Sequence, residues 1–365
     1  MTAELSLRLR TLTNLLADLE IDAMLVTDEK NVRYLSGFTG DSSYLLVQPA
    51  GTTILSDGRY DTQIAKECGE LAAVIRPPGQ LLGDLTQSVL NESGAARIGI
   101  EASQLTLSAY RYLDSACPGI ELIETSGVVE GLRMIKDDVE IEITRQAVRI
   151  AERAFAALLP MLNEGWSERA IAHELEAKMR FLGAEGCSFA PIVAAGAAGA
   201  LPHYHPHDVV LGGASTLLID WGANFQGYAS DLTRTLHRDS ASNAFRSAYD
   251  AVLEAQLAAI DKIGPGVPAK EVDAVARGVL EQAGIGDAFK HGLGHGTGLQ
   301  IHEAPRMSSI SEETLASGMI ITVEPGVYFE GDFGIRIEDD VLVTETGCEV
   351  LSQLPKGLDD CRLML

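Results

Sequence analysis

The chain of 365 residues is longer than one compact domain usually is, and its 46% hydrophobic and 22% charged residues are typical of a folded globular protein. Its formal charge of −24 argues against a nucleic-acid partner, because a phosphate binder needs a basic surface, and equally against an anionic membrane surface. We therefore expect two domains, and neither nucleic acid nor membrane as a partner.

Residues 1–22 predict an amphipathic helix and not a secretory signal, because charged residues interrupt what would be the apolar core of a signal peptide. No run in the chain approaches the ~20 apolar residues that span a bilayer. The five cysteines form no Cys-x-x-Cys pair, which argues against a disulfide framework or a zinc ribbon. These features favour the cytoplasm.

Residues 1–130 alternate helix and strand patterns. The apolar runs, each short enough for one strand, lie at 23–26, 44–47, 53–55, 73–75 and 97–100. A helical stretch at 81–90 separates the last two runs. This alternation predicts an α/β domain with a mixed sheet, and nothing in it suggests catalysis on chemical grounds alone.

Residues 131–365 predict an α+β domain. A connector at 128–136 leads into two helices, at 138–162 and 167–182. The expected strands are 191–193, 217–220, 228–236, 320–324 and 334–343. Two more helices, at 241–263 and 270–283, interrupt these strands.

Two aspartates occur where an apolar strand ends and returns. Asp220 follows Leu217–Ile219, and turn residues at 222–227 lead into a second strand that contains Asp231. A hairpin of this kind can bring the two carboxylates together. Isolated buried carboxylates are costly unless they are paired with cations, and Arg234 falls on the opposite strand face from Asp231. A divalent metal ion is the partner that this pattern favours.

Two further acids and one histidine have similar settings. Glu324 ends an apolar strand, and the alternation at 334–338 places Glu338 and Arg336 on the face opposite Ile335 and Ile337. His295 lies in a glycine-rich stretch that permits close backbone approach. Four carboxylates and one imidazole suit Mn²⁺, Co²⁺ or Zn²⁺. Because two divalent ions would balance four carboxylates and one would not, we expect two, with Mn²⁺ as the first choice and Co²⁺ or Zn²⁺ as alternatives.

Five motifs in this half of the chain resemble the metallopeptidases with the pita-bread fold, and among them the prolidase and aminopeptidase P branch. They lie at 218–223, 230–235, 291–296, 323–328 and 336–340. The resemblance implies that Asp220, Asp231, His295, Glu324 and Glu338 are the metal ligands. It also implies a pita-bread catalytic domain over residues 131–365.

The resemblance extends to the front of the chain. Residues 26–40 and 56–60 look like the creatinase-type N-terminal domain, and the connector at 131–136 is similar too. This implies a creatinase-like domain over residues 1–130. Nearly the whole chain is covered, and five motifs in order at family-like spacing are far more specific than any one of them.

The same resemblance assigns roles around the metals. It places His203 and His302 in contact with the substrate and the transition state, His291 in the substrate pocket, and Arg336 at the site, where it orients acids or a substrate carboxylate. An ordinary hydrogen-bonded histidine and a structural salt bridge are the alternatives. The resemblance makes Tyr328 a residue that supports the site from behind, and packing in the core is an equal alternative. His205 and His207 are expected on a solvated loop.

The activity implied is hydrolysis of the Xaa-Pro bond of dipeptides or short N-terminal Xaa-Pro peptides, by a hydroxide that bridges two metal ions, with Glu324 as the proton shuttle. Three alternatives are weaker. Methionine aminopeptidases normally lack the N-terminal domain and the arginine at 336, creatinases do not keep the ligand set, and a non-enzymatic binding protein would have lost ligands. Whether dipeptides or longer peptides are preferred stays open.

We also expect a homodimer or a larger even oligomer. Residues 33–41 predict a loop with aromatic, basic and acidic groups, and the resemblance suggests that it overhangs a partner's metal centre. A plain strand connection is the alternative.

Overall fold

The computed structural model describes residues 2–364, and their contacts divide them into one unit that ends at Arg133 and one that starts at Met134. Helix α6 (Val128–Arg133) runs through the boundary expected between residues 130 and 131, and that boundary stays a prediction. In the part of the chain that the structure describes, no helix is long and apolar enough to cross a membrane.

The first unit is built on a six-stranded sheet with the order β4-β3-β2-β1-β5-β6. β2 pairs antiparallel with β1 and β3, whereas the pairs β1/β5, β5/β6 and β3/β4 are parallel. The expected α/β class with a mixed sheet is therefore confirmed. The strands are β1 (Ala23–Val26), β2 (Tyr44–Gln48), β3 (Gly51–Asp57), β4 (Ala72–Arg76), β5 (Arg97–Glu101) and β6 (Glu121–Thr125). The other helices are α1 (Ala3–Asp18), α2 (Glu29–Ser36), α3 (Asp61–Glu67), α4 (Leu82–Glu92) and α5 (Leu107–Ala116).

Helix α1 is the amphipathic opening helix that the leucine spacing predicts. Thr2 caps it by accepting a hydrogen bond from the Leu5 amide, and Leu9, Leu12 and Leu16 are buried. The loop expected at 33–41 is different in the structure, because its first part belongs to α2. That helix ends where Gly37 adopts a left-handed conformation with φ of 75°.

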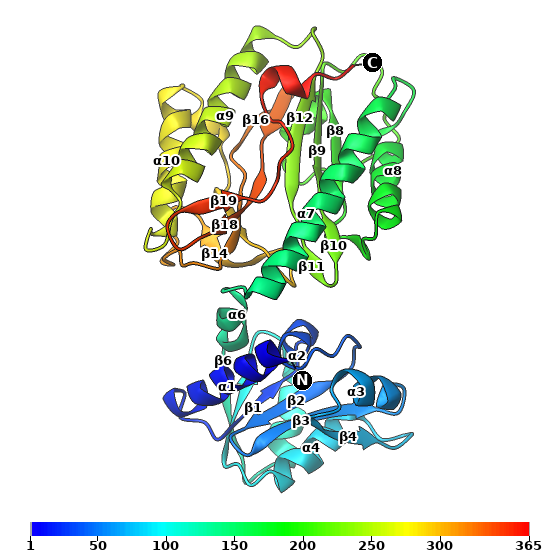
Figure 1. Cartoon of the computed structure of the whole chain (residues 1–365), viewed down its shortest axis with the longest axis vertical. Coiled ribbons are helices and arrows are strands. Elements are labelled where there is room, and N and C mark those ends of the chain that lie inside the picture. The colour runs from blue at the N-terminus through cyan, green and yellow to red at the C-terminus, as the bar shows by residue number, and fades with distance from the viewer. Residues whose placement is uncertain (1, 365) are drawn as a thin grey trace. The chain divides into compact units, whose positions relative to one another are not determined.

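The second unit has two pairs of helices, α7 with α8 and α9 with α10 (Figure 1). They are α7 (Asp138–Leu158), α8 (Glu168–Phe181), α9 (Asn243–Lys262) and α10 (Ala269–Gln282). A capping box starts α7: Asp137 accepts from the Glu140 amide, and Glu140 accepts from the Asp137 amide. The helix ends earlier than expected because Pro160 follows in a short 3-10 turn.

The strands of this unit pair antiparallel, in the orders β12-β9-β8, β14-β13-β15-β18-β19, β11-β10-β7 and β16-β17. They are β7 (Gly186–Cys187), β8 (Ile192–Ala195), β9 (Thr216–Trp221), β10 (Ala223–Phe225), β11 (Tyr228–Ala229), β12 (Leu232–His237), β13 (Gly294–Gly296), β14 (Glu303–Met307), β15 (Ile320–Val323), β16 (Gly326–Phe329), β17 (Phe333–Arg336), β18 (Asp339–Val343) and β19 (Cys348–Val350). The α+β class is confirmed.

Two expected strands are interrupted in the structure. The strand predicted over 228–236 divides into β11 and β12 with a break at Ser230–Asp231, and the one over 334–343 divides into β17 and β18 with a break at Ile337–Glu338. Thr233 and Glu338 form an isolated bridge between the two interrupted ribbons. Both breaks therefore place a candidate metal ligand where a strand is interrupted.

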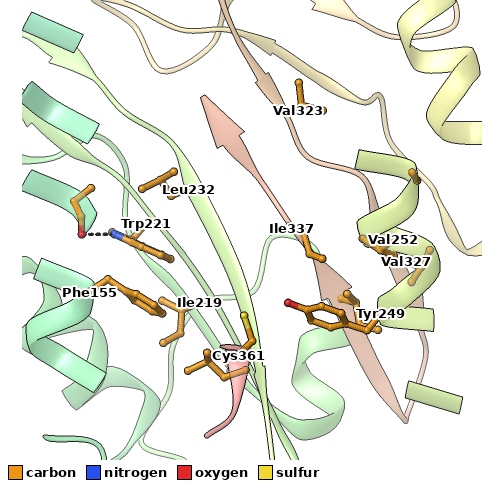
Figure 2. Packing of buried hydrophobic residues seen from close by; sticks show 14 of the residues in the cluster. Phe155, Ile219, Trp221, Leu232, Tyr249, Val252, Val323, Val327, Ile337 and Cys361 are labelled. Atoms are coloured by element: carbon orange, nitrogen blue, oxygen red, sulfur yellow. Dashed lines mark hydrogen bonds between the residues drawn. The ribbon is translucent and has the colours of Figure 1, made fainter. Parts of the chain in front are cut away.

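Trp221 anchors β9 to helix α7. Its ring stacks on Phe155 at 4.3 Å between centroids, and its indole Nε1 donates a hydrogen bond of 3.0 Å to the Ala151 carbonyl (Figure 2). Because successive side chains of a strand point to opposite faces, burying Trp221 against the helix turns Asp220 away from it.

Candidate metal centre

Asp220 and Asp231 meet across the β9–β12 ribbon. Asp220 pairs in register with Thr233, and Asp231 precedes β12. Gly222 permits the approach, since a Cβ there would lie 1.8 Å from the Ser230 carbonyl oxygen. Asp340 holds the interruption between β11 and β12 in place by accepting a 2.9 Å hydrogen bond from the Asp231 amide.

The other three side chains come from the neighbouring five-stranded sheet and its edges. Glu324 follows β15, Glu338 lies between β17 and β18, and His295 is in β13. Gly294 lets β13 approach β15 closely, because a Cβ there would lie 2.2 Å from the Thr322 carbonyl oxygen.

The structure brings all five predicted ligands to one place. Oxygen atoms of Asp220, Asp231 and Glu338 lie within 4.8 Å of one another. His295 Nε2 lies 3.6 Å from Asp231 Oδ2 and 3.4 Å from Glu324 Oε1. All five line one cavity of about 390 Å³, and we call them the five-residue cluster.

Burial opposes the charge of these acids. It raises the pKa of Asp220 despite the contact with Arg336, and raises the pKa of Glu324 to about 7. For Asp231 and Glu338, burial and the neighbouring carboxylates together raise the pKa well above its usual range. Four carboxylates with these surroundings need added positive charge to be ionised together at neutral pH.

Two observations fit a cation at this place. Asp220 Oδ1 is buried and has no hydrogen-bond partner in the described protein. His295 Nδ1 lies 3.0 Å from the Gly296 carbonyl, which can only accept, so Nδ1 carries the proton and Nε2 a lone pair. That lone pair faces carboxylate oxygens of Asp231 and Glu324. Such an arrangement of acceptors repels itself unless a metal ion or a proton lies between them.

Two threonines that sequence reasoning missed hold the acids in place. Thr233 Oγ1 donates a 2.5 Å hydrogen bond to Glu338 Oε2 and accepts one from Arg336 Nε. Thr322 Oγ1 accepts from the His295 amide and donates to Glu324 Oε1 at 3.2 Å. Threonine is common in β-strands, and both residues lie in strands. Their positions in the sequence therefore gave no sign that they support the site.

The structure also brings the predicted substrate-contacting histidines to this cavity. His203, His291 and His302 line it, and the His302 ring centroid lies 4.4 Å from that of His295. Burial lowers the pKa of His291 to about 4 and lowers that of His302, so both are neutral near pH 7. His205 and His207 were both expected on a solvated loop, and both are exposed. His205 also lines the cavity.

Arg336 and Tyr328 join this histidine wall to the acids. Arg336 donates to Asp220 Oδ2 at 2.6 Å and to the Tyr328 hydroxyl at 2.8 Å. The Tyr328 hydroxyl in turn lies 2.9 Å from His291 Nε2. The salt bridge that was one of the two expectations for Arg336 is therefore present. Its partner, Asp220, is a candidate metal ligand. Tyr328 is a supporting residue of the site as well as buried.

Two family models match the chain. Metallopeptidase family M24 matches residues 142–345, and the Creatinase/Prolidase N-terminal domain matches residues 8–135. An Xaa-Pro dipeptidase of Pyrococcus horikoshii is 34% identical over 93% of this chain and 94% of its own length. Among solved structures, the Xaa-Pro dipeptidase from Bacillus anthracis has a TM-score of 0.94 and 38% identity, over 97% of this chain and 99% of that one. The X-Pro aminopeptidase from Thermotoga maritima has a TM-score of 0.86 and 37% identity, over 93% and 97%.

Fold, site and relatives together define a metal-dependent hydrolase of the pita-bread class, as the motifs predicted. The chain belongs to metallopeptidase family M24 and carries the N-terminal domain found in creatinases and prolidases. Membership of this family implies divalent metal ions as cofactors.

Proposed function

We propose that this protein hydrolyses the Xaa-Pro bond of dipeptides or short peptides, with two divalent ions held by Asp220, Asp231, His295, Glu324 and Glu338. The observation that carries the proposal is the convergence of these five side chains in one cavity, with three histidines beside them. Mn²⁺ is the first choice because the donors are mostly carboxylate oxygens, with Co²⁺ and Zn²⁺ as alternatives.

When bound, the two ions supply a water of lowered pKa and positive charge beside the scissile carbonyl. Glu324 is the proton carrier: it takes a proton from the attacking water and gives it to the proline nitrogen as the C–N bond breaks. This role suits Glu324 because its side chain is 17% exposed and belongs to the more accessible part of the cluster.

His302 stabilises the oxygen that becomes negative when the carbonyl is attacked. As a neutral imidazole it can donate one hydrogen bond toward the cavity without adding charge. His203 and His291 bind the substrate. Arg336 orients Asp220 and opposes the effect of burial on its pKa. A direct contact between Arg336 and a substrate carboxylate is also part of this proposal.

Proline specificity is supported by the relatives named above and by the walls of the cavity. An Xaa-Pro bond is a tertiary amide, so the enzyme needs no acceptor for an amide N–H on the proline side. Phe189, Ile192 and Ile301 give the cavity apolar surface against which a pyrrolidine ring can pack.

The test compares substrates that differ in one feature each. Ala-Pro, Ala-Ala and Ala-Pro-Ala are assayed with Mn²⁺, Co²⁺ and Zn²⁺. We expect cleavage of Ala-Pro and not of Ala-Ala. Equal cleavage of both dipeptides would contradict proline specificity, and the tripeptide separates a dipeptidase from an enzyme that trims longer chains.

The proposal includes assembly: the protein forms a homodimer or a larger even oligomer in the cytoplasm. In this assembly residues 33–41 of one chain lie over the metal centre of a partner chain. Its support is the placement of Phe38, Asp41 and Tyr60 in one cluster of the first unit: the two rings meet edge to face at 5.4 Å, and the Tyr60 hydroxyl donates to Asp41. Light scattering of the active protein tests it, and a fully active monomer would refute the shared site.

A further inference from the structure

The segment that carries His203 has little regular structure of its own. Residues 196–209 follow β8 and contain only the short 3-10 helix η2 (Gly196–Ala200). His203 and His205 are both exposed side chains of this segment that line the catalytic cavity. A segment with so little regular structure depends on individual contacts with its neighbours to hold its side chains at fixed positions.

One buried carboxylate supplies three of these contacts. Glu168, the first residue of α8, is 0% exposed. Its Oε1 accepts from the Ala195 amide at 2.9 Å, and its Oε2 accepts from the Tyr204 hydroxyl at 2.8 Å and from the His207 amide at 3.1 Å. The three donors lie on both sides of His203 in the chain.

Backbone contacts place this carboxylate firmly. The Glu168 amide donates to the Val209 carbonyl at 3.0 Å, and the Arg169 amide donates to the His207 carbonyl at 3.1 Å. The position at the start of α8 also favours a negative side chain. A charged acceptor with three donors is stronger than neutral hydrogen bonds would be.

We propose that Glu168 is the positioning residue for His203: it ties the segment on both sides of this histidine and so fixes the imidazole in the substrate cavity. The inference rests on the proposed function, since it takes His203 as a substrate-binding group. Glu168 lines neither the cavity nor the five-residue cluster, so it acts through the segment and not on the substrate.

Glu168→Gln is the sharpest variant, because it keeps the shape and changes the acceptor pattern. A glutamine has one acceptor oxygen and one NH₂ group, which must face either the Ala195 amide or the Tyr204–His207 pair, and so at least one donor meets another donor. We expect kcat/KM for Ala-Pro to fall roughly 10- to 100-fold, mainly through KM, with unchanged Mn²⁺ content. Glu174→Gln, in a partly exposed ion pair with Lys178 on the same helix, is the matched control and should change kcat/KM less than about 2-fold.

A double-mutant cycle with His203→Ala separates positioning from general structural support. If Glu168 acts through His203, Glu168→Gln has less than about a 2-fold further effect once His203 is alanine. Equal losses in both backgrounds would overturn the proposal. Should Glu168→Gln fail to fold, Tyr204→Phe removes one donor only, and its smaller loss should likewise vanish in the His203→Ala background.

Hydrogen exchange gives a readout that does not depend on activity. The Ala195 and His207 amides should exchange faster in Glu168→Gln than in the wild type, with unchanged exchange in α9. Faster exchange without loss of kcat/KM would overturn the positioning role. If the wild type itself does not cleave Ala-Pro, the proposed function is wrong. Unchanged exchange at the Ala195 and His207 amides in Glu168→Gln would instead show that Glu168 does not hold the segment.

Discussion

Arg336 Nη2 lies 2.6 Å from Asp220 Oδ2, and both side chains are buried. This contact joins a fixed positive charge to a cluster of four carboxylates. Because the guanidinium also donates to Thr233 and Tyr328, its position is set from three sides. The protein therefore supplies part of the charge that its acids need before any metal ion binds.

Replacing this arginine should destabilise the metal-free protein. Arg336→Met leaves Asp220 buried without its cation, and breaking a buried pair costs about 3–5 kcal/mol in the free energy of unfolding. Urea denaturation in the presence of a chelator measures this cost. Arg238→Met is the control, because its partner Glu164 has a side chain that is 62% exposed, and we expect a change below about 1 kcal/mol. Equal small effects of the two changes would contradict the importance of the Arg336–Asp220 pair.

Thr233 should matter for metal affinity. Thr233→Val is nearly isosteric but removes the hydrogen bond to Glu338 and the acceptor for Arg336, so metal affinity should fall about 10- to 100-fold. Isothermal titration with Mn²⁺ measures it. Thr235→Val is the matched control on the same strand, since the Thr235 hydroxyl hydrogen-bonds to the backbone of Arg336 and not to a carboxylate of the cluster. An equal loss in both variants would mean that strand packing, and not the orientation of Glu338, is responsible.

His302 should affect turnover more than binding. His302→Ala removes one donor to the developing oxyanion, which lowers kcat roughly 10²- to 10³-fold while the Mn²⁺ content stays that of the wild type. Steady-state kinetics on Ala-Pro, with elemental analysis, measure both, and His173→Ala on the exposed face of α8 is the control. A loss confined to KM would assign His302 to ground-state binding instead.

The metal-free protein should lose stability as pH rises above 6.5. The acids of the cluster have raised pKa values in the folded state, about 7 for Glu324, so the folded state holds protons that the unfolded chain releases near pH 4.5. The stabilisation from these protons is complete below the unfolded pKa and is lost as pH rises through the folded pKa. His291 and His295, with pKa lowered to about 4, act in the opposite direction, but only below about pH 6.5.

Thermal unfolding at pH 6.5 and pH 8, with and without Mn²⁺, tests this sign. The Tm of the metal-free protein should be lower at pH 8, and bound metal should remove much of the difference because it compensates the charges. Glu324→Gln should reduce the difference in the metal-free protein. A metal-free Tm that rises from pH 6.5 to pH 8 would mean that these acids are not held protonated.

The sequence predicted the five-residue cluster better than it predicted how the chain forms it. The apolar runs before Asp220 and Glu324 located both acids at strand ends, where the structure has them. The breaks beside Asp231 and Glu338 were not predicted, because strand-forming residues lie on both sides of each break and the interruptions involve contacts with residues remote in the chain, Asp340 for Asp231 and Thr233 for Glu338. Spacing also placed Arg336 beside Glu338, whereas its partner proved to be Asp220, which is remote in the chain.

Local rules missed other features for the same reason. Glu168 follows an ordinary N-cap serine, and its three donors lie 27 to 39 residues away. The last part of α2, residues 33–36, was expected in a loop, because the charged, aromatic and glycine residues of 33–41 were interpreted without the burial of Val32 and Leu35 that gives this short helix its apolar face.

The dependence of Ala-Pro hydrolysis on metal content tests the central claim most directly. The protein is demetallated exhaustively, its metal content is checked by elemental analysis, and Mn²⁺ is returned stepwise while activity and bound ions are measured on the same samples. We predict no hydrolysis in the demetallated protein and recovery that saturates at two ions per chain, with Asp231→Asn binding fewer ions and recovering no activity. Full hydrolysis of Ala-Pro by protein verified to be free of metal would contradict the account.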